Sequence, residues 1–125
     1  MNKPTIKPDI VSEQDVKQMV NTFYDKVNTD DLLASIFNDF AEVDWEHHLP
    51  QMYQFWNMII LDRFGYKGQP FPKHMRLPIT KEHFERWLLL FRENLDAQFE
   101  GPNTEMAKSK ANNIANVFQH KLNLI

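Results

Sequence analysis

The sequence contains no cysteine and only three glycines among its 125 residues. Without cysteine, the chain cannot form disulfides, iron–sulfur clusters, a thiol nucleophile or a covalent Cys-x-x-Cys-His cofactor attachment. Phosphate-cradling loops and the dinucleotide fingerprint depend on glycine at fixed spacings, and neither motif occurs here. Thiol chemistry is therefore excluded, phosphate-cradling loops are not expected, and any cofactor must be held without a bond to cysteine sulfur.

Long apolar runs and basic runs are also missing. The formal net charge is −3, which does not suit nucleic acid or an anionic membrane surface. Apolar stretches such as residues 87–91 are far too short to span a bilayer. The first nine residues lack the apolar core of a signal peptide. We therefore expect a cytoplasmic protein with no nucleic-acid or membrane partner.

Period-two alternation, the pattern of strands, is absent over any useful length, whereas apolar residues recur at helical spacing. The pattern predicts an all-α fold in one domain over residues 1–125, with residues 1–10 as an extended arm. Four main helices and one short helix are expected. The first has a Ser12 cap and an apolar stripe from Val16 to Val27, and the short helix follows over residues 31–37. The next has a stripe from His48 and ends near Phe64 and Gly65, another has a Thr80 cap and a stripe from Phe84 to Leu95, and the last begins after Gly101 and Pro102. Leu89 and Leu90 widen the stripe from Phe84 to Leu95, so the middle of that helix is expected to be buried nearly all round.

Aromatic residues are plentiful, at 13% of the chain, and suit either a dense core or a flat apolar ligand. The connector over residues 65–78 holds two of the three glycines and three of the seven prolines, so it is expected to be a stiff loop with at most one helical turn. This loop carries His74. Two interpretations are open from the residues alone, a surface histidine or an axial iron ligand backed by the apolar side chains of Phe71, Met75 and Leu77.

Three more polar side chains lie on apolar helical stripes: Tyr24, His48 and Trp87. Core packing is the commoner explanation for each residue taken alone, and the alternative is an apolar pocket in which two donors and a histidine converge. His47 points about 100° away from His48 and is expected to be solvated. Pro50 fits best in a first helical turn, which predicts that the helix begins near His47.

Together these residues resemble the truncated hemoglobins, and within them the third group. The resemblance extends from about Ser12 to Leu122, and its segments are Phe23-Tyr24, Ile36-Phe37-Asn38, Trp45-Glu46-His47-His48, Phe55-Trp56, Tyr66-Lys67-Gly68-Gln69-Pro70, His74-Met75-Arg76-Leu77-Pro78 and Phe84-Glu85-Arg86-Trp87-Leu88. Each segment is weak alone, but their order and spacing are specific. The glycine pairs typical of the other truncated groups are missing, in agreement with the third group.

The resemblance implies a two-over-two helical sandwich around a non-covalent heme b, with a short proximal helix. It makes His74 the proximal iron ligand. It makes Tyr24 and Trp87 distal donors to the bound ligand and places His48 in the distal pocket. The remaining cofactor contacts that it implies are Phe37, Met52, Phe55, Trp56, Phe71 and Leu77, with Lys73 and Arg76 as propionate partners.

The function implied is reversible binding of oxygen, nitric oxide, carbon monoxide or similar diatomic ligands by a monomer. Nitric oxide dioxygenase or peroxidase-like activity would need electrons from an unidentified reductase, because the chain has no flavin or nicotinamide module. No residue is assigned as catalytic. The alternative from another class is a heme-free, all-helical module that binds a protein partner through its aromatic faces.

Overall fold

Helices make up the regular structure of the protein. The computed structural model describes residues 7–63 and 78–124, and the elements found there are α1 (Glu13–Thr29), α2 (Asp31–Ala34), η1 (Ser35–Phe40), α3 (Trp45–Leu61), α5 (Lys81–Gln98) and α6 (Pro102–Lys121). No residue of these two ranges lies in a strand. The predicted all-α class is confirmed.

Helix α1 follows the sequence signals closely. Ser12 and Asp15 form a capping box, in which the Ser12 hydroxyl accepts from the Asp15 amide at 3.2 Å. The Asp15 carboxylate accepts in turn from the Ser12 amide at 3.2 Å, so the backbone amides of both residues are hydrogen-bonded at the helix start. The predicted stripe is the buried face of the helix, formed by Val16, Met19, Val20, Phe23, Tyr24 and Val27.

The segment after α1 differs from the single short helix expected over residues 31–37. Asp30 caps α2 by accepting from the Leu33 amide at 3.1 Å, but α2 ends at Ala34. The chain then continues as a π-helix, and the Ala41 amide donates to the Ile36 carbonyl five residues earlier, at 2.9 Å. Helices of this kind are rare and are often found at functional sites.

Helix α3 begins at Trp45, two residues earlier than predicted, so Pro50 lies inside it rather than in the first turn. His48 therefore lies in the first turn of the helix. The predicted end near residues 64 and 65 is also wrong, because α3 ends at Leu61. Asp62 takes a left-handed conformation (φ 56°), and its amide donates to the Asn57 carbonyl, which closes the helix.

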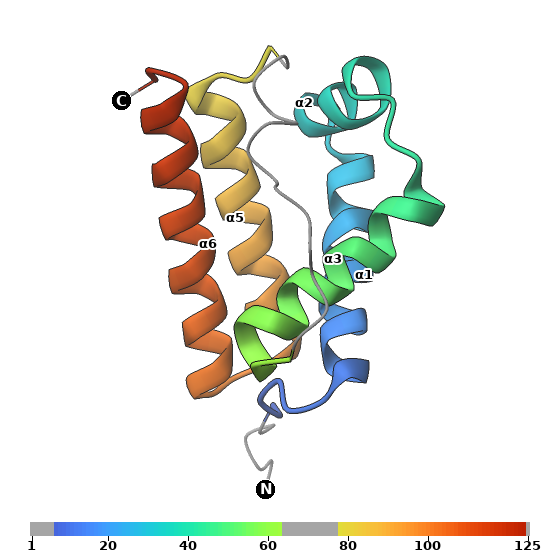
Figure 1. The fold of residues 1–125 in the computed structure, drawn as a ribbon, viewed down its shortest axis with the longest axis vertical. Helices are drawn as coiled ribbons and strands as arrows, with labels where there is room; N and C mark the ends of the chain where they lie inside the picture. The colour runs from blue at the N-terminus through green and yellow to red at the C-terminus, as the bar shows by residue number, and fades with distance from the viewer. Residues whose placement is uncertain (1–6, 64–77, 125) are drawn as a thin grey trace, which may run out of the picture.

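Helices α5 and α6 form an antiparallel pair joined by a short turn at Gly101, with Pro102 in the first turn of α6 as predicted (Figure 1). The expectation that the middle of α5 is buried all round is wrong, since Leu89 is 48% exposed. Neighbouring helices cover only part of the circumference of α5. The stripe Phe84, Phe91 and Leu95 is buried.

The helices form two layers. Helix α1 packs against α3, α5 packs against α6, and the two pairs meet through contacts of α1 with α5 and of α3 with α6 (Figure 1). A buried amide joins the layers, because the Asn94 side chain of α5 donates to the Met19 carbonyl of α1 at 3.0 Å. Within the described ranges, no helix has the length and apolarity needed to cross a membrane.

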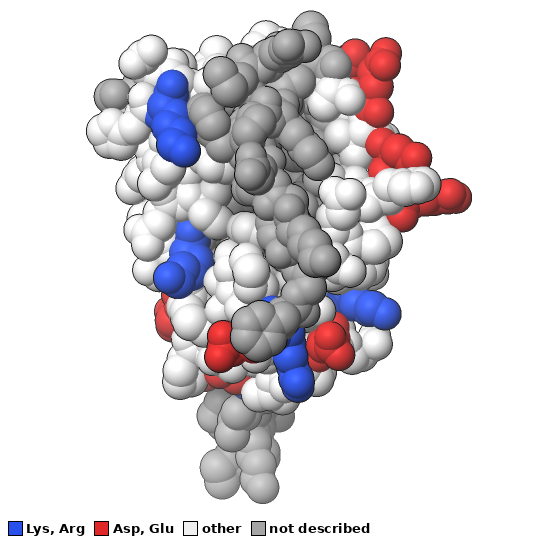
Figure 2. All heavy atoms as spheres, in the orientation of Figure 1, with Lys and Arg blue, Asp and Glu red and all other residues white. Residues whose placement is uncertain are grey.

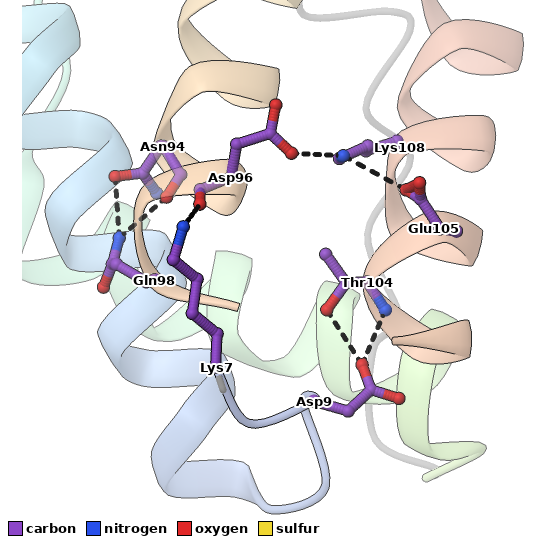
Figure 3. A network of polar contacts seen from close by, with 8 residues as sticks. All are labelled: Lys7, Asp9, Asn94, Asp96, Gln98, Thr104, Glu105 and Lys108. Atoms are coloured by element: carbon purple, nitrogen blue, oxygen red, sulfur yellow. Dashed lines mark hydrogen bonds and ion pairs between the residues drawn. The ribbon is translucent and has the colours of Figure 1, made fainter. Parts of the chain in front are cut away.

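The chain before α1 is fastened to the α5–α6 turn (Figure 3). Lys7 donates to the Asp96 carbonyl at 2.6 Å, and the Asp9 carboxylate accepts from the amide and the hydroxyl of Thr104, each at 2.8 Å. Gly101 makes this approach possible. It has φ +139°, and a Cβ atom added there would lie 2.6 Å from the Asp9 Cγ.

Candidate functional site

Tyr24 is the centre of an aromatic cluster between α1, η1 and α3. Its ring centroid lies 5.0 Å from that of Phe23, 5.2 Å from Trp45 and 5.4 Å from the His48 ring. Phe37 of the π-helix completes the surroundings at 5.8 Å. The resemblance implied Tyr24 and His48 as distal-pocket residues and Phe37 as a cofactor contact, and the structure brings these three side chains together.

Burial decides the chemistry of Tyr24. The residue is only 7% exposed, on the inner face of α1. Burial raises the pKa of the Tyr24 hydroxyl above its ordinary value of 10, since the phenolate would lose its hydration in this environment. The hydroxyl therefore keeps its proton at physiological pH and acts as a hydrogen-bond donor.

Trp87 lies on α5, in a second aromatic group that faces the same interior. Its ring stacks on Phe91 with 5.5 Å between centroids and meets Phe23 edge-on at 5.8 Å. Trp56 of α3 stacks on the same Phe91 at 5.0 Å. Phe23 contacts both groups and so links Trp87 to Tyr24. Among the described residues, the Trp87 and Tyr24 rings make no direct contact.

Two hydrogen-bond donors in these aromatic groups are available to a ligand. Within residues 7–63 and 78–124, no hydrogen bond joins the Tyr24 hydroxyl or the Trp87 indole N–H to another side chain or carbonyl. The contrast with Trp45 is clear, because its indole N–H donates to the Asn38 side-chain oxygen at 2.9 Å. Tyr24 is buried and Trp87 is half-buried, and neither donor is used by a protein acceptor within these ranges, so both can bond to a small ligand.

The two adjacent histidines have different surroundings. His48 is half-buried, and its ring lies 5.5 Å from Trp45 and 6.4 Å from Phe37. The His47 side chain is 81% exposed and pairs with the Asp44 carboxylate at 3.0 Å. The prediction that His47 is solvated is confirmed, and His48 faces the aromatic cluster.

The other predicted contacts on α3 follow one side of that helix. Met52 and Phe55 are half-buried, whereas Trp56 is buried. The rings of Phe55 and Trp56 meet edge-on at 5.3 Å. These side chains extend the apolar surface away from His48, as a flat cofactor would require.

The proximal half of the predicted site lies outside the described residues. It consists of His74, Phe71, Lys73, Arg76 and Leu77. Their proposed roles stay predictions from the sequence.

The residues present fit heme better than a bare metal ion. The described ranges hold no group of three or more His, Asp or Glu side chains able to bind a metal ion. They offer instead aromatic walls with an open hydroxyl and an open indole N–H, a combination that suits a planar apolar cofactor carrying a small polar ligand.

Residues 8–122 match the family described as bacterial-like globins. The chain belongs to this family. A group 3 truncated hemoglobin of Campylobacter jejuni is 31% identical to this globin over 121 residues, which cover 94% of this chain and 95% of that protein. The crystal structure of a group III truncated hemoglobin from Campylobacter jejuni matches this globin with a TM-score of 0.84 at 32% identity, and covers 94% of this chain and 95% of that one.

The resemblance to third-group truncated hemoglobins is confirmed by these matches, as is the globin-like fold. Globins carry heme and bind small gaseous ligands, so this globin is a heme-binding, ligand-binding protein. That conclusion favours the heme protein over a heme-free interaction module.

Trp45 was missed as a residue of the site. The sequence placed it in a family motif, but the expected helix start at His47 left it outside any element. Its ring lies in the cluster around Tyr24 because α3 begins at Trp45 itself. The Asp44-Trp45 junction, a capping residue before an aromatic, was the signal that could have set the helix start earlier.

Proposed function

We propose that this globin binds oxygen reversibly, with Tyr24 and Trp87 as hydrogen-bond donors to the ligand and His48 at the edge of the pocket. Heme b supplies the iron atom at which a diatomic ligand coordinates, and His74 is the proposed proximal ligand. The absence of cysteine supports non-covalent attachment of the cofactor. We propose that the protein acts as a monomer and that a separate reductase keeps the iron ferrous.

The open donors of Tyr24 and Trp87 carry this proposal. Both side chains belong to aromatic groups that share Phe23, so both rings have apolar neighbours. Hydrogen bonds strengthen where the local dielectric is low, so apolar surroundings favour a bond from either donor to an acceptor that arrives there. Oxygen bound at ferrous heme iron would carry partial negative charge, whereas carbon monoxide would be much less polar. The pair therefore favours oxygen.

Phe37, Met52, Phe55 and Trp56 are proposed to form the apolar wall against the cofactor. Their burial supports this role, since they present aromatic and thioether surface on the same side as His48. Phe71 and Leu77 are proposed to pack on the opposite side. Lys73 and Arg76 are proposed to pair with the propionates because of their positive charge.

The test is the rate of oxygen dissociation from the ferrous protein after removal of one donor at a time. A hydrogen bond to a polarised acceptor is worth about 1–3 kcal/mol. With about 1.4 kcal/mol for each factor of ten, Tyr24→Phe and Trp87→Phe should each speed oxygen release by roughly five- to a hundredfold. Carbon monoxide release should change less. If both donors bind the same ligand atom, the double variant should be non-additive.

Tyr53→Phe is the matched control for the loss of a tyrosine hydroxyl. The Tyr53 hydroxyl donates to the Asn21 side chain, away from the cluster around Tyr24, so its removal should leave oxygen release unchanged. Unaltered oxygen release in both Tyr24→Phe and Trp87→Phe would contradict the proposal and make these two residues part of the core.

A further inference from the structure

A chain of two hydrogen bonds connects α1, η1 and α3 beside the distal cluster. The Asn38 amide donates to the Asn28 side-chain oxygen at 2.9 Å, and the Trp45 indole N–H donates to the Asn38 side-chain oxygen at 2.9 Å. Each of the three residues comes from a different element. The chain therefore fixes the last turn of α1, the π-helix and the first turn of α3 relative to one another.

The Trp45 ring is at the inner end of this chain. It stacks on Phe37 with 5.8 Å between centroids and 29° between planes. It also lies 5.2 Å from Tyr24 and meets the His48 ring edge-on at 5.5 Å. Trp45 is thus in contact with the proposed donor, the proposed pocket histidine and the proposed cofactor wall at once.

The π-helix lets one short segment support Trp45 in two ways. Phe37 and Asn38 are consecutive, and the wide turn presents the Phe37 ring and the Asn38 amide to the same indole. The ring stack fixes the plane of the indole, and the hydrogen bond fixes its rotation within that plane. An indole held by both has a single orientation.

Stability alone does not account for this arrangement. Asn28 and Asn38 are exposed, and water competes for both of their hydrogen bonds. Such bonds contribute little net free energy, whereas their directionality is kept. Their main effect is to orient the Trp45 ring.

We propose that Trp45 is a positioning residue of the distal pocket, held by Asn38, and that it keeps Tyr24 and His48 in one arrangement toward the bound ligand. This inference rests on the proposed function. It predicts that loss of the Asn38 acceptor lets the pocket side chains adopt more than one arrangement. The polar environment of the ligand then becomes heterogeneous although every donor is still present.

The test compares Asn38→Ala, Asn38→Asp and Trp45→Phe with Asp39→Asn. Asn38→Asp loses the donor to Asn28 but keeps an acceptor for the indole, so it should restore the Trp45 hydrogen bond that Asn38→Ala loses. Asp39 is an exposed neighbour in the same π-helix and serves as the matched control. Asn38→Ala keeps the proposal testable if Trp45→Phe folds poorly.

The readouts are spectroscopic and use ferrous protein with carbon monoxide. The infrared C–O stretch reports the polarity beside the ligand, and NMR reports the Trp45 indole N–H and the His48 ring hydrogens. In Asn38→Ala, the C–O band should broaden or split, and the His48 signals should move. Exchange of the Trp45 N–H with solvent should be about fivefold faster or more, as expected for a lost hydrogen bond. Asn38→Asp and Asp39→Asn should match the parent protein.

An unchanged single C–O band and unchanged His48 signals in Asn38→Ala would overturn the proposal and leave Trp45 as a core residue. Failure of the proposed function would appear differently. Tyr24→Phe would then leave the C–O band unmoved, while the effect of Asn38→Ala on the His48 signals would still decide the role of Trp45.

Discussion

Burial opposes ionisation of both Tyr24 and Asp9, but the pKa values of the two groups shift in opposite directions. Burial raises the pKa of the Tyr24 hydroxyl, and no charge nearby offsets it. Burial also opposes ionisation of Asp9, but hydrogen bonds from Asn103, Thr104 and Ile10 outweigh it and lower the pKa of that carboxyl. Tyr24 is therefore a protonated donor, and Asp9 is a charged acceptor at the start of α6.

Asp9 should contribute stability that depends on pH. Its pKa is lowered in the folded protein, so the contribution is complete above the unfolded value of about 3.9 and is lost as the pH falls through the folded value. Asp9→Asn should lower the free energy of unfolding at pH 7 by about 0.5–2 kcal/mol, the range for charges and caps at helix N-termini. The difference should shrink as the pH falls through the lowered pKa of Asp9.

Denaturant titrations of both proteins at a series of pH values measure this difference. Asp25→Asn, which neutralises an exposed carboxylate on α1, is the control and should change stability by less than about 0.5 kcal/mol. A deficit of Asp9→Asn that persists undiminished at the acid end would show that the Asp9 charge is not the cause.

At the scale of elements, the turn between α5 and α6 depends on one glycine. Gly101 has φ +139°, and the Asp9 side chain occupies the space in which a Cβ atom would lie. Gly101→Ala should lower the free energy of unfolding by about 1–3 kcal/mol, the cost of a strained backbone conformation. Thermal or denaturant unfolding of the ferric protein measures the loss.

The double variant Gly101→Ala with Asp9→Ala separates backbone strain from the collision. Removing the Asp9 carboxylate opens the space for the new Cβ atom. The double variant should therefore lose less stability than the sum of the losses in the two single variants. Strict additivity would mean that the close approach of Asp9 to Gly101 costs nothing in the single variant.

One ion pair connects elements across the layers near the distal cluster. Arg86 of α5 donates to the Asp30 carboxylate at 2.6 Å, and Asp30 also caps α2. Burial opposes ionisation of Asp30, yet the Arg86 hydrogen bond, the Leu33 amide and the Arg86 charge together lower its pKa. Residues 27–62 contain no Lys or Arg, so Arg86 supplies a cation that this stretch lacks.

Local signals predicted those parts of the fold that depend on the chain alone. The Ser12 capping box, the buried stripe of α1 and the Gly101-Pro102 boundary follow from spacing and capping, and the structure confirms them. The π-helix could not be predicted, because no spacing or capping signal in residues 35–40 distinguishes it from an α-helix, and the contact of its Phe37 ring with Tyr24 joins residues of different elements. Exposure of Leu89 likewise depends on which helices lie beside α5.

The candidate site divides in the same way. Tyr24, His48 and Trp87 could be placed in one pocket by resemblance to a family, and the structure brings the first two into ring contact. The place of Trp45 in the site could not be predicted from the sequence. It depends on a hydrogen bond to Asn38, 7 residues away in η1, and on where α3 begins. Spacing along a sequence does not specify such a contact.

At the scale of the whole molecule, the charges are unevenly distributed. Acidic side chains gather over η1 and the start of α3, and Lys and Arg are visible over other elements (Figure 2). Exposed acids of this region are Asp39, Glu42, Asp44 and Glu46. A neutral diatomic ligand is not steered by this field, so the charge does not hinder its access to the pocket.

If this globin works as proposed, heme fills the space between the aromatic groups and His74 ligates it. Titration of the purified protein with hemin, followed by the Soret band, tests this most directly, with His74→Ala compared with His47→Ala and His120→Ala. The two control histidines are exposed. We predict saturation at one heme per chain for the parent and both controls, with loss of stable heme binding in His74→Ala. A parent protein that remains fully helical without taking up heme, or a His74→Ala variant with the spectrum of the parent, would contradict the account.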